Sequence, residues 1–332
     1  MNAIPDTSTQ PLLRVRQLGV RFGALPVLQG VTFELRQGET LGLVGESGSG
    51  KSTLARAVLR LLPVSSGSIA FGGEDLLALG TADLRRRRRD LQLVFQDPLA
   101  SLNPRMSIGD TLAEPLEIHE PSLPRRLRQA RIAEMLERVG LSADMAQRYP
   151  HEFSGGQCQR IGIARAMMLR PKLLICDEPV SALDVSIQGQ IVNLLVDLQR
   201  DFGTALLFIS HNLAVVRHLS HRVLVIYGGR LVEIADRDEL FAAPAHPYTR
   251  ALLAAIPHAA PPAEPYTRTP LASAPPLAAG AGGAVPTSAA GCAFHARCPY
   301  GQAGCLRSVP QLEEIAPHHF AACHRWREVV YS

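Results

Sequence analysis

The fold of this 332-residue chain is decided by the stretch Gly45-Glu46-Ser47-Gly48-Ser49-Gly50-Lys51-Ser52, which Thr53 follows. The stretch fits the P-loop pattern in full. Its glycines let backbone amides converge on phosphate oxygens, and a helix expected from Lys51 to about Leu62 offers its positive end. The Lys51 ammonium reaches the outer phosphates, and the Ser52 hydroxyl binds Mg²⁺. The stretch therefore predicts a nucleotide site.

Short apolar segments on both sides of this loop predict an α/β fold. Residues 31–35 and 41–44 have β-type composition, so strand, glycine loop and helix occur in that order. Residues 173–176 and 205–210 are apolar runs that suit parallel strands, which helices bury on both faces. Ahead of the first of these two runs, from about residue 97 to 170, helical patterns dominate, including one at residues 125–139. We expect a helical insertion there.

Composition narrows the class of protein. Apolar residues make up 46% of the chain, enough for a sizeable core. No apolar run approaches the ~18 residues that a membrane-spanning helix needs, and residues 1–17 lack a secretory signal. The net charge of +4 is too small to indicate a nucleic-acid partner. We expect a protein that is soluble and cytosolic, or that is held at a membrane by something other than its own spanning helix.

A P-loop needs a second carboxylate to hold its metal, and the end of the 173–176 run supplies one. Asp177 follows that run directly and is expected to bind Mg²⁺, directly or through water. The adjacent Glu178 is placed to orient and polarise the attacking water. Cys176, within the run, is interpreted as a small apolar core residue.

Further motifs resemble those of the ABC transporter ATPases. The sequence Phe153-Ser154-Gly155-Gly156-Gln157 is similar to the signature motif of that family. Gln96 matches the Q-loop, residues 181–184 match the D-loop, and His211 matches the switch histidine. The resemblance implies an ABC-type P-loop ATPase core with a mixed sheet and a helical subdomain, an enzyme that hydrolyses ATP with Mg²⁺.

The resemblance also implies roles for particular residues. Two such subunits sandwich ATP between the P-loop of one chain and the signature motif of the other. Gln96 joins Ser52 and Asp177 at Mg²⁺, while Phe22 lies where the family places an aromatic that stacks on adenine. The implied catalytic residues are Glu178, His211 and Gln96, and the implied nucleotide contacts are Phe22, Gly45, Glu46, Ser47, Gly48, Ser49, Gly50, Lys51, Ser52, Thr53, Ser154, Gly155, Gly156, Gln157 and Asp184.

Within that family the chain is most similar to the dipeptide, oligopeptide and nickel importer branch, and to the second of its two ATPase subunits. Residues 96–105, 149–153, 180–186 and 246–253 carry this similarity. It implies a subunit on the cytoplasmic face of the inner membrane that works with a second ATPase subunit, two permeases and, indirectly, a periplasmic binding protein. The surface around residues 99–117 would receive a permease helix. Import of nickel or another small solute is the alternative.

Three other functions are possible for a P-loop protein, and the sequence disfavours each of them. A P-loop GTPase is disfavoured because no Asn-Lys-x-Asp run exists. A soluble ABC ATPase that acts on ribosomes or DNA usually has two cassettes or a long coiled-coil insertion, and neither is present. A metal-binding scaffold with a vestigial nucleotide site would require damage at Lys51, Asp177, Glu178 or His211, which are all intact.

Four cysteines crowd the end of the chain: Cys292, Cys298, Cys305 and Cys323. Their irregular spacing does not match the close pairs of zinc ribbons, so the spacing itself leaves a metal site open. Residues 291–298 resemble the tail of peptide importer ATPases, in some of which four cysteines hold a [4Fe–4S] cluster. The alternatives are Zn²⁺ and free or regulatory thiols. We expect an ATPase domain at 1–257, an Ala/Pro/Gly-rich linker at 258–290 and a Cys-rich extension at 291–332.

Two positions depart from the branch pattern. Asn212 follows His211 where aspartate is usual, which would change how the histidine loop is anchored. Cys158 occupies a position that is commonly basic. Neither residue is expected to touch phosphate.

Overall fold

The computed structural model describes residues 10–255 and 290–330. Nearly all of the predicted linker, 258–290, lies outside these ranges. The predicted domain boundaries stay predictions. No helix in the described ranges combines the length and the apolar character needed to cross a bilayer.

The main sheet has eight strands in the order β11-β12-β10-β9-β3-β8-β7-β6. Strands β9, β3, β8, β7 and β6 are parallel, whereas β10, β12 and β11 add to the β9 edge in antiparallel pairs. The bounds are β3 (Thr40–Val44), β6 (Leu91–Val94), β7 (Leu173–Asp177), β8 (Ala205–Ile209), β9 (Arg222–Tyr227), β10 (Arg230–Asp236), β11 (Glu313–Ala316) and β12 (His319–Ala321). The mixed α/β fold expected from the sequence is confirmed.

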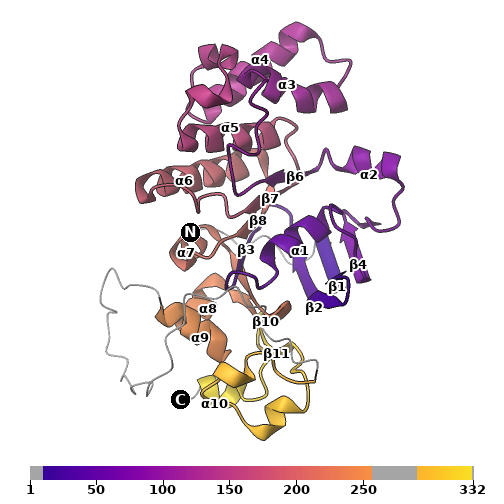
Figure 1. Ribbon diagram of the computed structural model, residues 1–332, viewed down its shortest axis with the longest axis vertical. Coiled ribbons are helices and arrows are strands. Elements are labelled where there is room, and N and C mark those ends of the chain that lie inside the picture. Colours follow the sequence, from indigo (N-terminus) through magenta and orange to yellow (C-terminus); the bar gives the residue numbers. More distant parts are fainter. Residues whose placement is uncertain (1–9, 256–289, 331–332) are drawn as a thin grey trace.

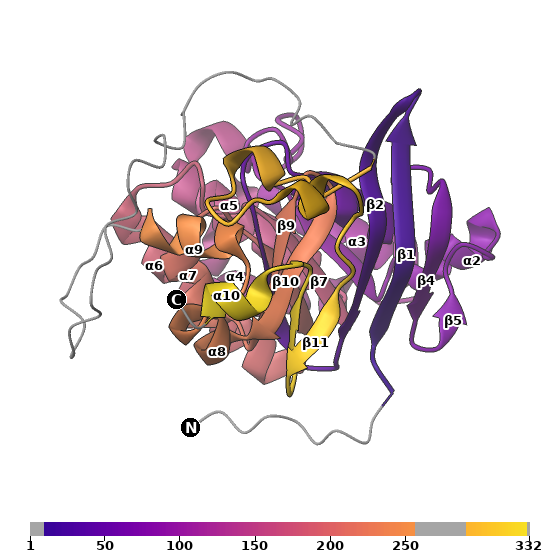
Figure 2. The same cartoon turned by 90° about the horizontal axis from the view of Figure 1, so that it is seen from below.

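A second, antiparallel sheet lies beside the main one (Figure 2). It has the order β2-β1-β4-β5 and consists of β1 (Leu13–Phe22), β2 (Leu25–Leu35), β4 (Ser66–Phe71) and β5 (Glu74–Asp75). Helix α1 (Lys51–Val58) belongs to the same apolar core as this sheet and one face of the main sheet. The start of α1, where the P-loop ends, is therefore fixed by packing on both sides.

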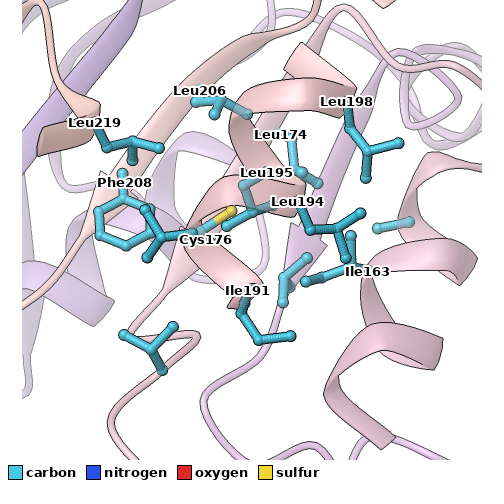
Figure 3. Packing of buried hydrophobic residues seen from close by; sticks show 14 of the residues in the cluster. Ile163, Leu174, Cys176, Ile191, Leu194, Leu195, Leu198, Leu206, Phe208 and Leu219 are labelled. Carbon is cyan, nitrogen blue, oxygen red and sulfur yellow. The ribbon is translucent and has the colours of Figure 1, made fainter. Parts of the chain in front are cut away.

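The apolar run of β7 is continuous because both faces of that strand are buried. Leu173 and Ile175 belong to the core that contains α1, while Leu174 and Cys176 belong to the core under the helices on the other face. Figure 3 shows Cys176 among leucine, isoleucine and phenylalanine side chains of this second core. Burial on both faces is what a parallel strand needs, and the interpretation of Cys176 as a core residue is confirmed.

Figure 1 shows α3, α4 and α5 at one end of the molecule and residues 290–330 at the other. The helix predicted at 125–139 is present as α4 (Arg125–Arg138), although the apolar side chain of Leu127 in it is 53% exposed. The remaining helix bounds are α2 (Thr81–Arg87), α3 (Ile108–His119), α4 (Arg125–Arg138), α5 (Gly155–Met167), α6 (Val185–Phe202), α7 (Leu213–Leu219), α8 (Arg237–Ala242), α9 (Pro247–Ala254) and α10 (Trp326–Val330), with short 3-10 turns at Ala143–Gln147, Pro150–Glu152, His295–Arg297 and Ala303–Leu306.

The prediction that the first helix extends to Leu62 was wrong, because α1 ends at Val58. Arg60 adopts a left-handed backbone conformation, with φ of 50°, which stops a helix. Its guanidinium donates to the carbonyl oxygens of Leu76 and Leu79, both at 2.7 Å. A long-range contact therefore ends this helix, and no local signal in the sequence predicted it.

Residues 290–330, the C-terminal segment, pack against the main sheet. Strand β12 pairs with β10, with Ala321 opposite Glu233 and Phe320 opposite Ile234. The buried carboxylate of Glu233 lies 2.7 Å from His319 Nε2 and accepts the backbone N–H groups of Ala245 and His246. A buried polar group of this kind needs all its partners, so the contact with His319 helps to hold the segment on the sheet.

Candidate functional site

The loop between β3 and α1 has the glycine geometry that a phosphate cradle needs. Gly48 and Gly50 have φ of 78° and 104°, which side chains rarely adopt. At Gly45, a Cβ atom would lie 2.3 Å from the carbonyl oxygen of Ile226, so only glycine fits there. The loop then leads directly into the first turn of α1, where unpaired backbone N–H groups are available for an anion.

Lys51 is buried at the start of α1, and its ammonium folds back over the loop. Lys51 Nζ donates to the carbonyl oxygens of Gly45 and Glu46 at 2.8 and 2.9 Å, and it lies 3.9 Å from Glu178 Oε1. Burial lowers the pKa of Lys51, and the negative charges of Glu178, Asp177 and Glu46 oppose this shift. The ammonium is thus placed among acidic groups, where a phosphate would add further negative charge for it to bind.

Ser52 and Asp177 form an oxygen-ligand pair. Ser52 Oγ donates to Asp177 Oδ1 at 2.9 Å. Ser52 lies in the first turn of α1, after the loop that follows β3, and Asp177 ends β7. The carboxyl ends of β3 and β7 lie at the same edge of the parallel sheet, with β8 between the two strands. Burial raises the pKa of Asp177, while the Ser52 hydroxyl lowers it. Hydroxyl and carboxylate oxygens are ligands that Mg²⁺ prefers, so this pair suits that ion.

Glu178 lies at the centre of a second polar group. Its Oε2 atom is 3.5 Å from Gln96 Nε2 and 3.1 Å from His211 Nδ1. Gln96, Glu178 and His211 follow β6, β7 and β8, so neighbouring strands deliver all three side chains to one place. The backbone of Glu178 is left-handed, with φ of 49°, a strained geometry that costs about 1–3 kcal/mol and is typical of functional positions.

A cavity of about 390 Å³ opens over the P-loop. Val27, in β2, forms part of its wall, a contact that sequence reasoning missed because no motif marks β2. The complete lining is Val27, Ser47, Gly48, Gly50, Lys51, Ser52, Thr53, Gln96 and Glu178. Backbone amides, an ammonium, hydroxyls and a carboxylate therefore line one concave surface, which suits a metal-bound triphosphate.

The predicted adenine-stacking residue lies apart from this cavity. Phe22 ends β1 next to the turn into β2, is 48% exposed and is not among the lining residues. Asp184 is also exposed, and it precedes α6 at a position where its side chain forms no cap hydrogen bond. The nucleotide contacts of both residues stay predictions.

The signature motif forms the start of α5. Ser154 Oγ accepts the backbone N–H of Gln157 at 3.3 Å, and the Gln157 side chain accepts the N–H of Ser154 at 2.9 Å, which is a capping box. Ser154 and Gly155 are exposed, and no signature residue lines the P-loop cavity. Within one chain, the two motifs therefore do not meet.

The two departures from the branch pattern have ordinary structural roles. Asn212 caps α7, because its Oδ1 atom accepts the N–H groups of Ala214 and Val215 at 3.1 and 3.4 Å. The histidine loop is thus anchored by an amide in place of a carboxylate. Cys158 is fully buried in α5, and burial raises the pKa of its thiol.

The four C-terminal cysteines share one small cavity of about 10 Å³. All have free thiols, and burial raises the pKa of Cys292 and Cys298, and that of Cys323 to about 11. Within residues 10–255 and 290–330, however, no group of three or more His, Cys, Asp or Glu side chains has the arrangement of a metal site. The structure gathers the predicted ligands but does not show a preformed site.

The C-terminal segment also contacts the P-loop, which the sequence did not predict. Arg297 forms an ion pair with Glu46 at 2.9 Å. Two hundred and fifty-one positions separate these residues, and no motif connects them. Only the docked segment brings them together.

Comparisons with known proteins agree with this geometry. The family described as "ABC transporter" matches residues 28–181, and the family "Oligopeptide/dipeptide transporter, C-terminal region" matches residues 232–305. The chain is 51% identical to the oligopeptide transport ATP-binding protein OppF of Salmonella typhimurium, over 96% of this chain and 97% of that protein. It is 47% identical to the Escherichia coli protein of the same name, with the same coverage.

Solved structures also resemble this chain. One is cbiO1 of Clostridium perfringens, part of an ABC transporter complex, with a TM-score of 0.65 and 28% identity over 70% of this chain and 92% of that one. Another is an ATP-binding cassette in a dimeric, post-hydrolysis state bound to ADP and Pi, with a TM-score of 0.62 and 26% identity over 68% of this chain and 98% of that one.

Proposed function

The chain belongs to the ABC transporter family and is an ATP hydrolase of that family, and from this premise we propose that it powers the import of di- and oligopeptides across a membrane. The observation that carries the peptide assignment is the near full-length similarity to OppF together with the match to the oligopeptide transporter C-terminal region. The nickel and soluble-ATPase alternatives lack comparable support.

We infer the role of each site residue from its geometry. Ser52, Asp177 and Gln96 hold Mg²⁺, which supplies positive charge to the phosphate oxygens when bound. Lys51 and the backbone amides of the loop bind the β- and γ-phosphates. Glu178 orients and polarises the attacking water, and His211, at 3.1 Å from Glu178, contacts the γ-phosphate.

The exposed signature motif supports a two-chain site. Since Ser154 and the start of α5 lie outside the P-loop cavity of their own chain, a second subunit must present this motif to the γ-phosphate. Each hydrogen bond to the charged phosphate is worth about 1.5–3 kcal/mol. The partner is a related ATPase subunit or a second copy of this chain, and closure of the pair on ATP drives the transporter.

Transport assays test the peptide assignment. The chain is combined in proteoliposomes with the proposed partners, a second ATPase subunit, two permeases and a peptide-binding protein. We expect labelled oligopeptides to accumulate with ATP, and peptide-loaded binding protein to stimulate hydrolysis. Accumulation of nickel chelates without peptide uptake would contradict the peptide assignment and support the alternative.

A groove of about 290 Å³ among β6, α3 and α5 is the proposed docking site for the permease helix. Its wall includes the exposed Phe95 and Ile118, each 46% exposed, and the paired charges of Glu114 and Arg165 at 2.7 Å. An apolar floor with a charged rim suits a short amphipathic helix. The groove overlaps the predicted surface at 99–117 and extends it on both sides.

Replacing Ile118 by Asp is expected to weaken binding to the permeases by about 2 kcal/mol, because a carboxylate would be desolvated in the groove. Co-purification with the permeases measures the loss, and the ATPase rate of the isolated chain should stay unchanged. Leu127→Asp, at a residue 53% exposed on α4 and outside the groove, is the matched control. Equal co-purification of both variants would exclude this docking site.

We propose that Cys292, Cys298, Cys305 and Cys323 hold a [4Fe–4S] cluster, with Zn²⁺ as the alternative. The convergence of all four cysteines on one small site and the four-thiol donor set support this proposal. Anaerobic purification should give a broad visible absorbance and about four irons per chain. A Cys305→Ser variant should lose iron, whereas Cys158→Ser, at a buried cysteine outside that site, should keep it. Stoichiometric zinc without iron would support the alternative.

We further propose the domain limits of 1–257 for the ATPase, 258–290 for the linker and 291–332 for the Cys-rich extension, and a peripheral location on the cytoplasmic face of the inner membrane. The four clustered cysteines support a separate extension, although β12 continues the ATPase sheet. Attachment through the permeases accounts for the location.

A further inference from the structure

Glu46 is a P-loop residue that binds distant parts of the chain through both its backbone and its side chain. Its backbone N–H donates to Tyr248 Oη at 2.8 Å, and its carboxylate, 28% exposed, points to the C-terminal segment. The charge of Glu46 also acts on Lys51, since it opposes the fall in the pKa of that ammonium. The position and the charge of Glu46 therefore both bear on the phosphate-binding groups.

Arg297 binds the Glu46 carboxylate in a bidentate arrangement of two hydrogen bonds. Its two terminal nitrogens donate to Glu46 Oε2 and Oε1 at 3.0 and 2.9 Å. The guanidinium also lies over the rings of Tyr227 and Phe294, 5.8 and 5.6 Å from their centroids. A bidentate, stacked arginine has little remaining freedom, so it fixes the direction of the group that it binds.

The turn that carries Arg297 is itself anchored on the ATPase. Phe294, three residues earlier and only 3% exposed, packs against Tyr227, Tyr248 and His246, with ring centroids 5.2, 5.5 and 5.9 Å away. Tyr248 also accepts the backbone N–H of Glu46. The same aromatic cluster therefore supports both Arg297 and Glu46, the two residues of the ion pair. The C-terminal segment therefore contacts the phosphate loop directly, through the ion pair of Arg297 with Glu46.

We propose that Arg297 is a positioning residue for nucleotide binding: by pairing with Glu46 it fixes the first turn of the P-loop and neutralises a carboxylate beside the phosphate site. This proposal rests on the nucleotide site proposed above. It makes the affinity for MgATP depend on the docking of the C-terminal segment, more than 250 positions away in the sequence. The chemical step itself uses other residues, so the effect belongs to binding and not to turnover.

The test is a double-mutant cycle on the full chain, with Kd measured with a fluorescent ATP analogue and Mg²⁺, and with KM and kcat from phosphate release. Arg297→Gln should raise Kd and KM about three- to tenfold and change kcat less than twofold. In a Glu46→Gln background, the same change should alter Kd less than twofold, because the partner carboxylate is already gone. Arg307→Gln, an exposed arginine of the same segment that takes part in none of the ion pairs among the described residues, is the matched control and should behave like the parent.

A merely structural role would lower the melting temperature of Arg297→Gln without moving Kd, and that result would overturn the proposal. An equal loss of affinity in the parent and Glu46→Gln backgrounds would also overturn it. If Arg297→Gln does not fold, Arg297→Lys keeps the charge without the bidentate arrangement and should raise Kd about two- to threefold. A parent chain that binds no MgATP would overturn the nucleotide site as well, whereas a binding parent with an unaffected variant refutes only the role of Arg297.

Discussion

Glu178→Gln is expected to slow ATP hydrolysis by about 10²–10⁴-fold, because glutamine cannot accept a proton from the attacking water. The side chains of Gln96 and His211, at 3.5 and 3.1 Å from the carboxylate, keep an amide in nearly the same place. MgATP should still bind, since Ser52 and Asp177 remain. The measurements are phosphate release at saturating ATP and Kd for MgATP.

Two variants make this test specific. Glu137→Gln, at an exposed position on α4 with no ion pair among the described residues, removes the same charge and should hydrolyse ATP at the parental rate. Asp177→Asn should weaken MgATP binding, because it removes a proposed metal ligand that lies 2.9 Å from Ser52. A Glu178→Gln variant with the parental rate would refute the assignment of Glu178 as the general base.

The parts of the site that could be predicted from sequence are those that local pattern determines. Glycine spacing and Lys51 mark the phosphate loop, and Asp177 marks the end of a buried strand. Parallel strands align their carboxyl ends, so Gln96, Glu178 and His211 meet without any further information. The order of β6, β7 and β8 in the sheet therefore brings these three side chains together.

Other features depend on contacts between distant residues, and sequence reasoning missed them. Helix α1 ends early because Arg60 binds carbonyl groups of residues 76 and 79. Strand β12 joins the sheet through β10, and its apolar pattern is too short to predict a partner. The ion pair of Arg297 with Glu46 likewise exists only after this docking. Short, irregular segments carry little periodicity, so their positions follow from the fold as a whole.

The signature motif offers the sharpest test of the two-chain site, and Gly155→Asp is expected to reduce ATPase activity by about 10²-fold or more. A carboxylate at the start of α5 would face the γ-phosphate that is bound by the neighbouring chain, and the two negative charges would repel each other. The hydrogen bonds from the signature motif to this phosphate, each worth about 1.5–3 kcal/mol, would be lost. ATP binding to the P-loop of a single chain should stay intact. Size-exclusion chromatography with ATP, in a Glu178→Gln background, should show loss of the nucleotide-dependent dimer.

The Gly155→Asp variant should fold, because the structure has space for a side chain at this position. A Cβ atom on Gly155 would come no closer than 3.9 Å to Leu183, whereas one on Gly156 would lie 2.8 Å from Ile187. An acid in the first turn of α5 also suits the helix dipole, so stability should fall by less than about 0.5 kcal/mol. Gly155→Ala, which adds the Cβ atom without charge, is the control and should keep most of the activity. A Gly155→Asp protein that still pairs on ATP and hydrolyses it at the parental rate would show that α5 does not face a phosphate of the neighbouring chain.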